Sequence, residues 1–251
     1  MALLKGYVAI VTGASRGIGR AVAERLAGEG AAVVVNYRKN RAAAESVVEG
    51  ILISGGTAIA VQADMTKLND LRRLFTETMG RFGQLDILVA NAGYSEFKPL
   101  ADTTEEDFDQ TYAVNAKGTF FCLQEALRHM SDGGRIVCVS TIGTQLNLPG
   151  GACYFGSKAA VEQYCRVLAK EVAHRNITVN AISPGFIDTD MMADTMGCGA
   201  NDAIAPLIDM TPLGRLGKPQ DIADAVAFLV GPDARWITRQ NFPVDGGIIS
   251  R

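Results

Sequence analysis

The sequence predicts an α/β fold: a doubly wound parallel sheet with helices on both faces, in a single domain. Short apolar stretches alternate along the chain with segments of helical period, and such stretches are typical of strands buried on both faces. Right-handed crossovers through the helices then place the strands in one parallel sheet. At 251 residues and 48% hydrophobic composition, the chain can bury one large core, so we expect a single domain over residues 1–251.

The elements follow one another in a regular order. We expect strands near residues 7–12, 31–36, 57–62, 85–90, 134–139, 176–182 and 240–244, and helices near 17–29, 40–54, 67–82, 104–130, 153–174 and 219–230. The exception is the segment of about 186–218, which has no clear period and is rich in methionine. Long irregular segments in compact domains are often functional, and methionine adapts to varied apolar ligands. We therefore expect a substrate lid here, with an ordinary packed excursion as the alternative.

The first strand and its helix enclose a glycine-rich turn. The apolar run Val8–Val11 is followed by Gly13, Gly17 and Gly19, and a helical pattern then begins. This arrangement can bind a pyrophosphate, because glycines let a ligand approach the backbone and a helix N-terminus presents free N–H donors. The spacing Gly-x-x-x-Gly-x-Gly differs from the Gly-x-Gly-x-x-Gly of the standard dinucleotide fingerprint. The flanking strand and helix disfavour the alternative, a glycine-rich loop without a ligand.

The end of the second strand indicates which coenzyme the chain uses. An NAD-dependent enzyme usually has Asp or Glu at this point, where the carboxylate binds the ribose 2′-hydroxyl. Residues 31–44 contain no acid, and Arg38, Lys39 and Arg41 follow the strand instead. Guanidinium and ammonium groups bind a 2′-phosphate well, so these residues, with Arg16 in the glycine turn, predict NADP(H). Solvated charges at the start of the next helix are the alternative.

Three side chains in the second half of the chain form a candidate acid/base set. Tyr154 and Lys158 stand four positions apart in a predicted helix, so both project from one face. A nearby ammonium lowers the pKa of a phenol and makes it an acid/base nearer neutral pH. Ser140 ends the preceding strand and can hold a substrate oxygen beside the phenol, with the neighbouring hydroxyl of Thr141 as the alternative. Taken alone, a tyrosine and a lysine at this spacing are far more often an ordinary surface pair, so the weight of Tyr154 and Lys158 comes from the glycine turn.

Together these motifs resemble the classical short-chain dehydrogenase/reductase family. The matching stretches are Thr12–Gly19, Asn91-Ala92-Gly93, Asn115, Ser140, Tyr154-x-x-x-Lys158, Pro184-Gly185 and Val244–Gly247. Their order and spacing match that family over nearly all of the chain, which implies its Rossmann fold. The chain looks most similar to 3-oxoacyl-carrier-protein reductases and to polyketide or naphthol ketoreductases.

The resemblance implies NADPH-dependent reduction of a ketone, whether 3-oxoacyl, polyketide-like or another, to a secondary alcohol. Tyr154 would donate the proton, Ser140 would orient the oxygen, and Lys158 would lower the pKa of Tyr154 and bind the nicotinamide ribose. Asn115 would shape its helix so that a water can connect to the lysine, and Asp64 would contact the adenine. The residues expected around the coenzyme are Gly13, Ser15, Arg16, Gly17, Ile18, Gly19, Tyr37, Arg38, Ala63, Asp64, Met65, Asn91, Ala92, Gly93, Tyr154, Lys158, Pro184, Gly185, Ile187 and Thr189.

Two other functions use the same fold. One is an NAD(P)-dependent alcohol dehydrogenase working in the oxidative direction, and the other is a nucleotide-binding regulator without turnover, which the complete acid/base set disfavours. The expected substrate is a small carbonyl compound, free or attached to a carrier. The resemblance also implies a homotetramer with two-fold symmetry, which the apolar helix near 104–130 and the segment Trp236–Ile249 support.

Composition argues against several classes of protein. The net charge of −3 is unusual for a nucleic-acid binder, and no apolar run approaches the length of a transmembrane helix. None of the five cysteines forms a Cys-x-x-Cys pair, and no zinc-ligand spacing occurs, so no metal site is expected. With no signal peptide and with cysteines suited to reduced thiols, we expect a cytoplasmic protein without nucleic-acid or membrane partners.

Overall fold

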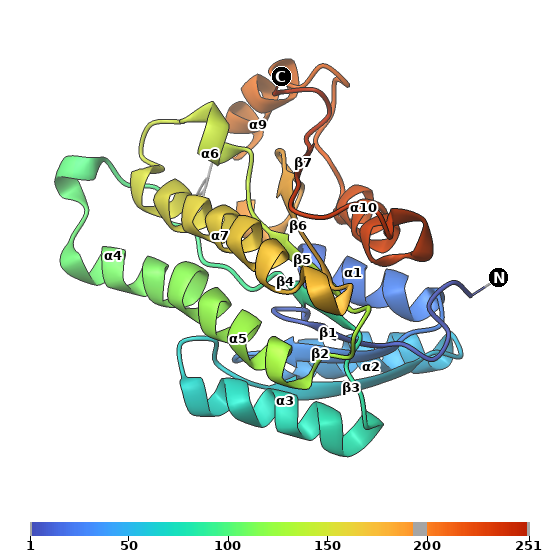
Figure 1. Ribbon diagram of the computed structural model, residues 1–251. Helices are drawn as coiled ribbons and strands as arrows, with labels where there is room; N and C mark the ends of the chain where they lie inside the picture. The colour runs from blue at the N-terminus through green and yellow to red at the C-terminus, as the bar shows by residue number, and fades with distance from the viewer. Residues whose placement is uncertain (1, 193–199, 250–251) are drawn as a thin grey trace.

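The computed structural model describes residues 2–192 and 200–249. Seven strands of these residues form one parallel sheet in the order β3-β2-β1-β4-β5-β6-β7 (Figure 1). The strands are β1 (Val8–Val11), β2 (Ala32–Tyr37), β3 (Thr57–Gln62), β4 (Ile87–Ala90), β5 (Arg135–Val139), β6 (Thr178–Pro184) and β7 (Asn241–Val244). Each lies where an apolar stretch predicts a strand.

Helices connect the strands and cover both faces of the sheet. They are α1 (Gly17–Gly28), α2 (Arg41–Ile53), α3 (Leu68–Phe82), α4 (Glu105–Tyr112), α5 (Thr119–His129), α6 (Gly143–Leu146), α7 (Ala152–Glu171), α9 (Ala200–Asp209) and α10 (Pro219–Val230). Short 3₁₀ turns cover Leu100–Asp102, Ala173–Arg175 and Pro232–Ala234.

The sheet separates two apolar cores. The buried sides of α1, α2 and α10 pack on one face, and those of α3, α5 and α7 pack on the other (Figure 1). Neighbouring residues of one strand enter different cores: Ala9 and Val11 lie in the first, and Ile10 lies in the second. Side chains of a strand point alternately to opposite faces, so wholly apolar strands are what a doubly covered sheet requires. The predicted doubly wound α/β fold is confirmed.

The helix expected over residues 104–130 is divided into three parts. α4 begins with a capping box between Thr104 and Asp107, a π-helical segment spans Ala113–Gly118, and α5 continues from there. A Cβ on Gly118 would lie 2.8 Å from the Met65 carbonyl oxygen, so this segment passes close to the chain after β3. Apolar spacing does not distinguish one π-helical turn from α-helix, which is why the sequence predicts a continuous helix.

The segment of about 186–218 is partly helical, contrary to the expectation of an irregular stretch. α9 occupies ten of its residues and contains Pro206, a residue that normally interrupts a helical pattern. Residues 193–199, with Met196, Gly197 and Gly199, lie outside the described residues. The lid therefore stays a prediction.

The carboxyl ends of the parallel strands meet at one edge of the sheet, where open α/β sheets bind their ligands. Thr12 follows β1, Asn91 follows β4 and Ser140 follows β5, so motifs far apart in sequence meet at this edge. Among the described residues, no helix is long and apolar enough to cross a membrane.

Candidate active site

The glycine turn after β1 is held by its own packing. The Gly13 amide donates to Asn36 Oδ1 at 3.1 Å. Gly13 and Gly17 have φ of 63° and 55°, in the left-handed region that glycine enters without strain. A Cβ on Gly19 would lie 2.4 Å from the Gly13 carbonyl oxygen. All three motif glycines are therefore required by the turn itself.

The start of α1 fits an anionic group. No side chain caps this helix at Arg16, and no acid lies in its first turn, so the helix start has the properties of an anion site. A Cβ on Gly17 would lie 3.6 Å from the Thr189 methyl carbon, which places the chain after β6 beside the helix start. Arg16 lies 3.6 Å from Asp190 with both side chains exposed, and exposed pairs contribute little to stability. A phosphate could therefore replace Asp190 as the partner of Arg16.

Asn91 ties the end of β4 to the glycine turn. Its Nδ2 donates to the carbonyl oxygens of Thr12 and Gly13 at 2.8 and 3.2 Å. In return, the Thr12 hydroxyl accepts from the Asn91 and Ala92 amides, each at 2.9 Å. The motif Asn91-Ala92-Gly93 thus holds the glycine turn in place, in addition to any contact that it makes with a ligand.

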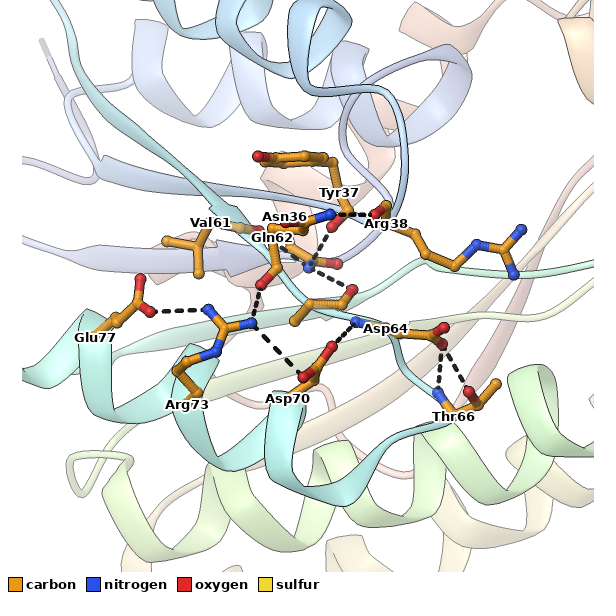
Figure 2. Close-up of polar contacts among 11 residues, drawn as sticks. Asn36, Tyr37, Arg38, Val61, Gln62, Asp64, Thr66, Asp70, Arg73 and Glu77 are labelled. Carbon is orange, nitrogen blue, oxygen red and sulfur yellow. Dashed lines mark hydrogen bonds and ion pairs between the residues drawn. The ribbon is translucent and has the colours of Figure 1, made fainter.

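Asn36 lies near the end of β2, the region in which an NAD-dependent enzyme usually has an acid. It is 1% exposed, and its Nδ2 donates to the carbonyl oxygens of Val61 and Ala63 at 3.3 and 3.2 Å (Figure 2). With Oδ1 on Gly13, this amide joins the glycine turn, β2 and β3. An amide can donate and accept at once, whereas a carboxylate only accepts. One backbone N–H group and two backbone carbonyl oxygens therefore require a side chain at this position that both donates and accepts.

Arg38 and Asp64 lie at the end of the site nearest β2 and β3. Asp64 Oδ1 accepts from the Thr66 amide at 2.9 Å and from its hydroxyl at 2.8 Å. Burial raises the pKa of Asp64, but the Thr66 hydrogen bonds and the charges of Arg38 and Lys67 outweigh it, so the pKa lies below its usual value. Figure 2 shows the Arg38 guanidinium pointing away from the hydrogen-bonded residues. Arg38 is exposed and Tyr37 beside it is buried.

Ala63 and Met65 are placed differently from the other expected coenzyme residues. Both side chains are buried in the core on the α3 side of the sheet. Only their backbone could line a ligand site at this edge.

Three turns of α7 meet the three residues at the end of β5. Lys158 Nζ donates to the Val139 carbonyl oxygen at 2.8 Å. The Ser140 hydroxyl donates to Glu162 Oε1 at 2.8 Å. Thr141 acts on the third residue of this face, because its side chain lowers the pKa of the Tyr154 phenol. Positions 154, 158 and 162 share one helix face. This face of α7 therefore lies along the segment Val139–Thr141.

Burial, rather than the lysine, dominates the titration of Tyr154. It raises the pKa of the phenol to about 12, against a smaller lowering by the Thr141 hydrogen bond. Burial also lowers the pKa of Lys158 to about 8, with a small opposing effect of Cys138. The net shift of the Tyr154 pKa is therefore upward, in place of the lowering expected from Lys158, because the ammonium is directed to the Val139 carbonyl oxygen and burial disfavours the charged form of each group.

Asn115 is buried in the π-helical segment and joins two parts of the site. Its Oδ1 accepts from the Tyr94 amide at 2.8 Å, and its Nδ2 donates to the Tyr94 carbonyl oxygen at 2.8 Å and to Ser157 Oγ at 2.9 Å. A Cβ on Gly93 would lie 3.3 Å from Lys158 Nζ and 3.5 Å from Asn115 Oδ1. Asn115, Gly93 and Lys158 are therefore neighbours.

The chain after β6 completes the edge of the site. The Gly185 amide donates to the Val244 carbonyl oxygen at 3.0 Å, and a Cβ on Gly185 would lie 2.7 Å from Asp245 Cα. Ile187 pairs with Gly217 in an isolated bridge, and the Thr189 hydroxyl donates to the Ile187 carbonyl oxygen at 3.3 Å. Pro184–Thr189 is thus fixed between the C-terminal strand and the glycine turn.

An aromatic side chain that the sequence does not single out lies beside the phenol. Phe97 is 40% exposed, and its ring centroid lies 6.1 Å from that of Tyr154 and 5.5 Å from that of Phe155.

Glu162 is the other residue that sequence reasoning missed. Its signal was present, because Glu162 continues the Tyr154–Lys158 spacing by one more turn.

Comparison with known proteins gives a family. A family model described as enoyl-(acyl carrier protein) reductase matches residues 13–249. A hydroxynaphthalene reductase-like protein from Metarhizium brunneum is 43% identical over 98% of this chain and 96% of its own length. The angucycline ketoreductase LanV, solved with bound NADP, is 40% identical with a TM-score of 0.92, over 98% of this chain and 96% of that one.

A short-chain dehydrogenase from Burkholderia cenocepacia, solved in complex with NADP, is 39% identical with a TM-score of 0.91, over 98% of this chain and 99% of that one. The family model runs from the glycine turn to the segment after the C-terminal strand, and the three relatives each cover 98% of this chain. The chain belongs to the classical short-chain dehydrogenase/reductase family and is an oxidoreductase acting on CH–OH and C=O groups.

Proposed function

We propose that this enzyme uses NADPH to reduce a ring ketone to a secondary alcohol, with Tyr154 as the proton donor. The observation that carries the proposal is the seating of one α7 face on the turn after β5, next to Gly93 and the glycine turn. This brings a phenol, an ammonium and two hydroxyls to the edge where the family binds its coenzyme.

The protonation states of these groups favour reduction. A phenol with a pKa of about 12 holds its proton at neutral pH, as a donor to a carbonyl oxygen must. When bound, a nicotinamide coenzyme would supply the hydride for the carbonyl carbon. Tyr154 then gives its proton to the oxygen, and Lys158, still mostly protonated at pH 7 with a pKa of about 8, stabilises the phenolate that remains. The oxidative direction needs the phenolate at the start, which burial disfavours.

The residues around the coenzyme site support NADP(H). The start of α1 has no capping side chain and no acid in its first turn, as an anion site requires, and Asn36 leaves no carboxylate that would repel a 2′-phosphate. Arg38 is exposed at the end of β2. The relatives from Burkholderia cenocepacia and LanV are solved with NADP, which agrees with this choice.

Phe97 suggests the class of substrate. An aromatic ring that is 40% exposed beside the proton donor offers a flat face on which an aromatic ring can stack. Two of the similar proteins are named for fused-ring compounds, a hydroxynaphthalene and an angucycline. We therefore favour an aromatic or polyketide-derived ring ketone over a linear 3-oxoacyl thioester.

The test is a substrate and coenzyme panel. We expect the protein to oxidise NADPH with α-tetralone, to turn over acetoacetyl-N-acetylcysteamine more slowly in kcat/KM, and to prefer NADPH to NADH with both. Tyr154→Phe should bind NADPH, measured by coenzyme fluorescence, and lose about 10²-fold or more of kcat.

Each proposed feature has an outcome that contradicts it. Preference for the linear thioester would overturn the ring-ketone class. Turnover only with alcohols and NADP⁺ would favour the oxidative dehydrogenase. NADPH binding without turnover of any ketone or alcohol would favour the regulator.

A further inference from the structure

We propose that Glu162 is a positioning residue of this active site, which holds the turn after β5 on α7 through the hydroxyl of Ser140. The inference rests on the proposed reductase function, because it assigns a role toward Tyr154. Glu162 extends the helix face of Tyr154 and Lys158 by one turn, and each of the three contacts one residue of Val139–Thr141.

The surroundings of Glu162 are unusual for a side chain that only solvates a helix. Glu162 is 7% exposed. Its Oε1 accepts from Ser140 at 2.8 Å and from Thr144 at 2.7 Å, and Arg166 lies 3.4 Å from Oε2. A buried carboxylate is destabilising unless hydrogen bonds and a counter-charge compensate it. Here the compensating donors include a residue of the predicted catalytic set.

The hydroxyls of Ser140 and Thr141 act on different groups. A carboxylate only accepts, so Ser140 directs its proton to Glu162, while the Thr141 side chain acts on the phenol of Tyr154 and lowers its pKa. Bonds from a hydroxyl to a carboxylate are short and strong. Glu162 thereby fixes Ser140 and, through the one peptide between them, the place of Thr141 beside Tyr154.

The experiment is a double-mutant cycle between Glu162 and Ser140. Glu162→Leu keeps the bulk and removes the acceptor, and Glu162→Gln keeps one acceptor oxygen. Each is made in wild type and in Ser140→Ala, and hydride transfer from NADPH to α-tetralone is measured in single turnovers. Unchanged binding of NADPH, measured by fluorescence, shows that the coenzyme site is intact.

We expect Glu162→Leu to slow hydride transfer by about ten- to a hundredfold, since small misplacements of reacting groups have effects of this size. Glu162→Gln should recover part of the rate and remain at least about threefold slow. In the Ser140→Ala background, neither substitution should add a further loss, because the link they break is already absent.

Thr144→Val is the matched control, since Thr144 donates to the same carboxylate oxygen from α6 and not from the turn after β5. We expect a rate within about twofold of wild type. A loss equal to that of Glu162→Leu would mean that Glu162 merely holds α6 and would overturn the proposal. So would a wild-type rate in Glu162→Leu, or a full further loss in the Ser140→Ala background.

If Glu162→Leu does not fold, the cycle with Glu162→Gln decides by the same criteria, with a loss below twofold overturning the role. Wild-type turnover of α-tetralone together with its loss in Tyr154→Phe is measured first. No turnover of α-tetralone by wild type, or full turnover by Tyr154→Phe, contradicts the proposed function. A cycle without the expected rate losses contradicts only the role of Glu162.

Discussion

Burial moves the two titrating groups of the site in opposite directions. It raises the pKa of the Tyr154 phenol to about 12 and lowers that of the Lys158 ammonium to about 8. Both shifts have one cause, because a low-dielectric site disfavours a phenolate as much as an ammonium. The phenol and the lysine are then both protonated at pH 7, and the lysine is the first to lose its proton as the pH rises.

The first prediction concerns pH. We expect kcat for ketone reduction to fall as the pH rises through about 8, because Lys158 loses the charge that stabilises the phenolate. Lys158→Arg should move this fall in kcat to higher pH, since a guanidinium stays charged. The measurement is a pH profile of kcat with saturating NADPH for both proteins. If kcat of the arginine variant still falls near pH 8, the titrating group is not Lys158.

The second prediction concerns Arg38. We expect Arg38→Ala to raise KM for NADPH at least about tenfold and to leave KM for NADH almost unchanged. A charge-assisted hydrogen bond to phosphate contributes about 1.5–3 kcal/mol, and about 1.4 kcal/mol is tenfold. Arg81→Ala is the control, because it removes the same charge from an exposed side chain in the last turn of α3, outside the residues expected around the coenzyme. Equal losses with both coenzymes would show that Arg38 is structural.

Between single residues and the whole fold, the elements show what sequence patterns predict well. All seven strands could be predicted because strands in a doubly covered sheet are rich in apolar residues, and the shared helix face of Tyr154 and Lys158 could be predicted because a spacing of four marks one helix face. α9 was missed because Pro206 interrupts the pattern in its middle. Glu162 was missed because a glutamate in a helix is usually solvated, and only the fold shows that it is buried against Ser140.

Asn36 shows how elements restrict a substitution that sequence logic would suggest. Asn36→Asp adds the acid of an NAD-dependent enzyme, but here the new oxygen would face the carbonyl oxygens of Val61 and Ala63. We expect this variant to lose about 1–3 kcal/mol of unfolding free energy, the cost of unsatisfied buried groups. Chemical denaturation measures the loss.

Asn40→Asp is the matched control for that measurement. Asn40 begins α2, and its side chain accepts from the Ala43 amide at 3.0 Å. Aspartate caps a helix as well as asparagine does, so the same chemical change should be nearly neutral there. Equal stability of Asn36→Asp and wild type would contradict the assigned role of the Asn36 amide.

The whole molecule carries exposed apolar side chains on both of its helical layers. On the α7 side, Phe108 and Phe120 are each 46% exposed, and the Phe120 ring lies 5.4 Å from that of Tyr164 on α7. On the α10 side, Phe228 is 51% exposed and Trp236 is 94% exposed. Two separate patches can form two different two-fold contacts, and two such contacts together close a tetramer.

The last prediction is that the enzyme assembles through both patches. We expect light scattering to give a particle of four chains of 26.6 kDa each, because large aromatic side chains in water favour burial against a second copy. Phe120→Glu should open the contact on the α7 side and Trp236→Ser the contact on the α10 side, each leaving dimers, while the double variant should be monomeric. Ile53→Glu serves as the control, since Ile53 is 80% exposed on α2 and belongs to neither patch. A wild-type monomer at micromolar concentration would contradict the assembly, and tetramers in both single variants would place its contacts elsewhere.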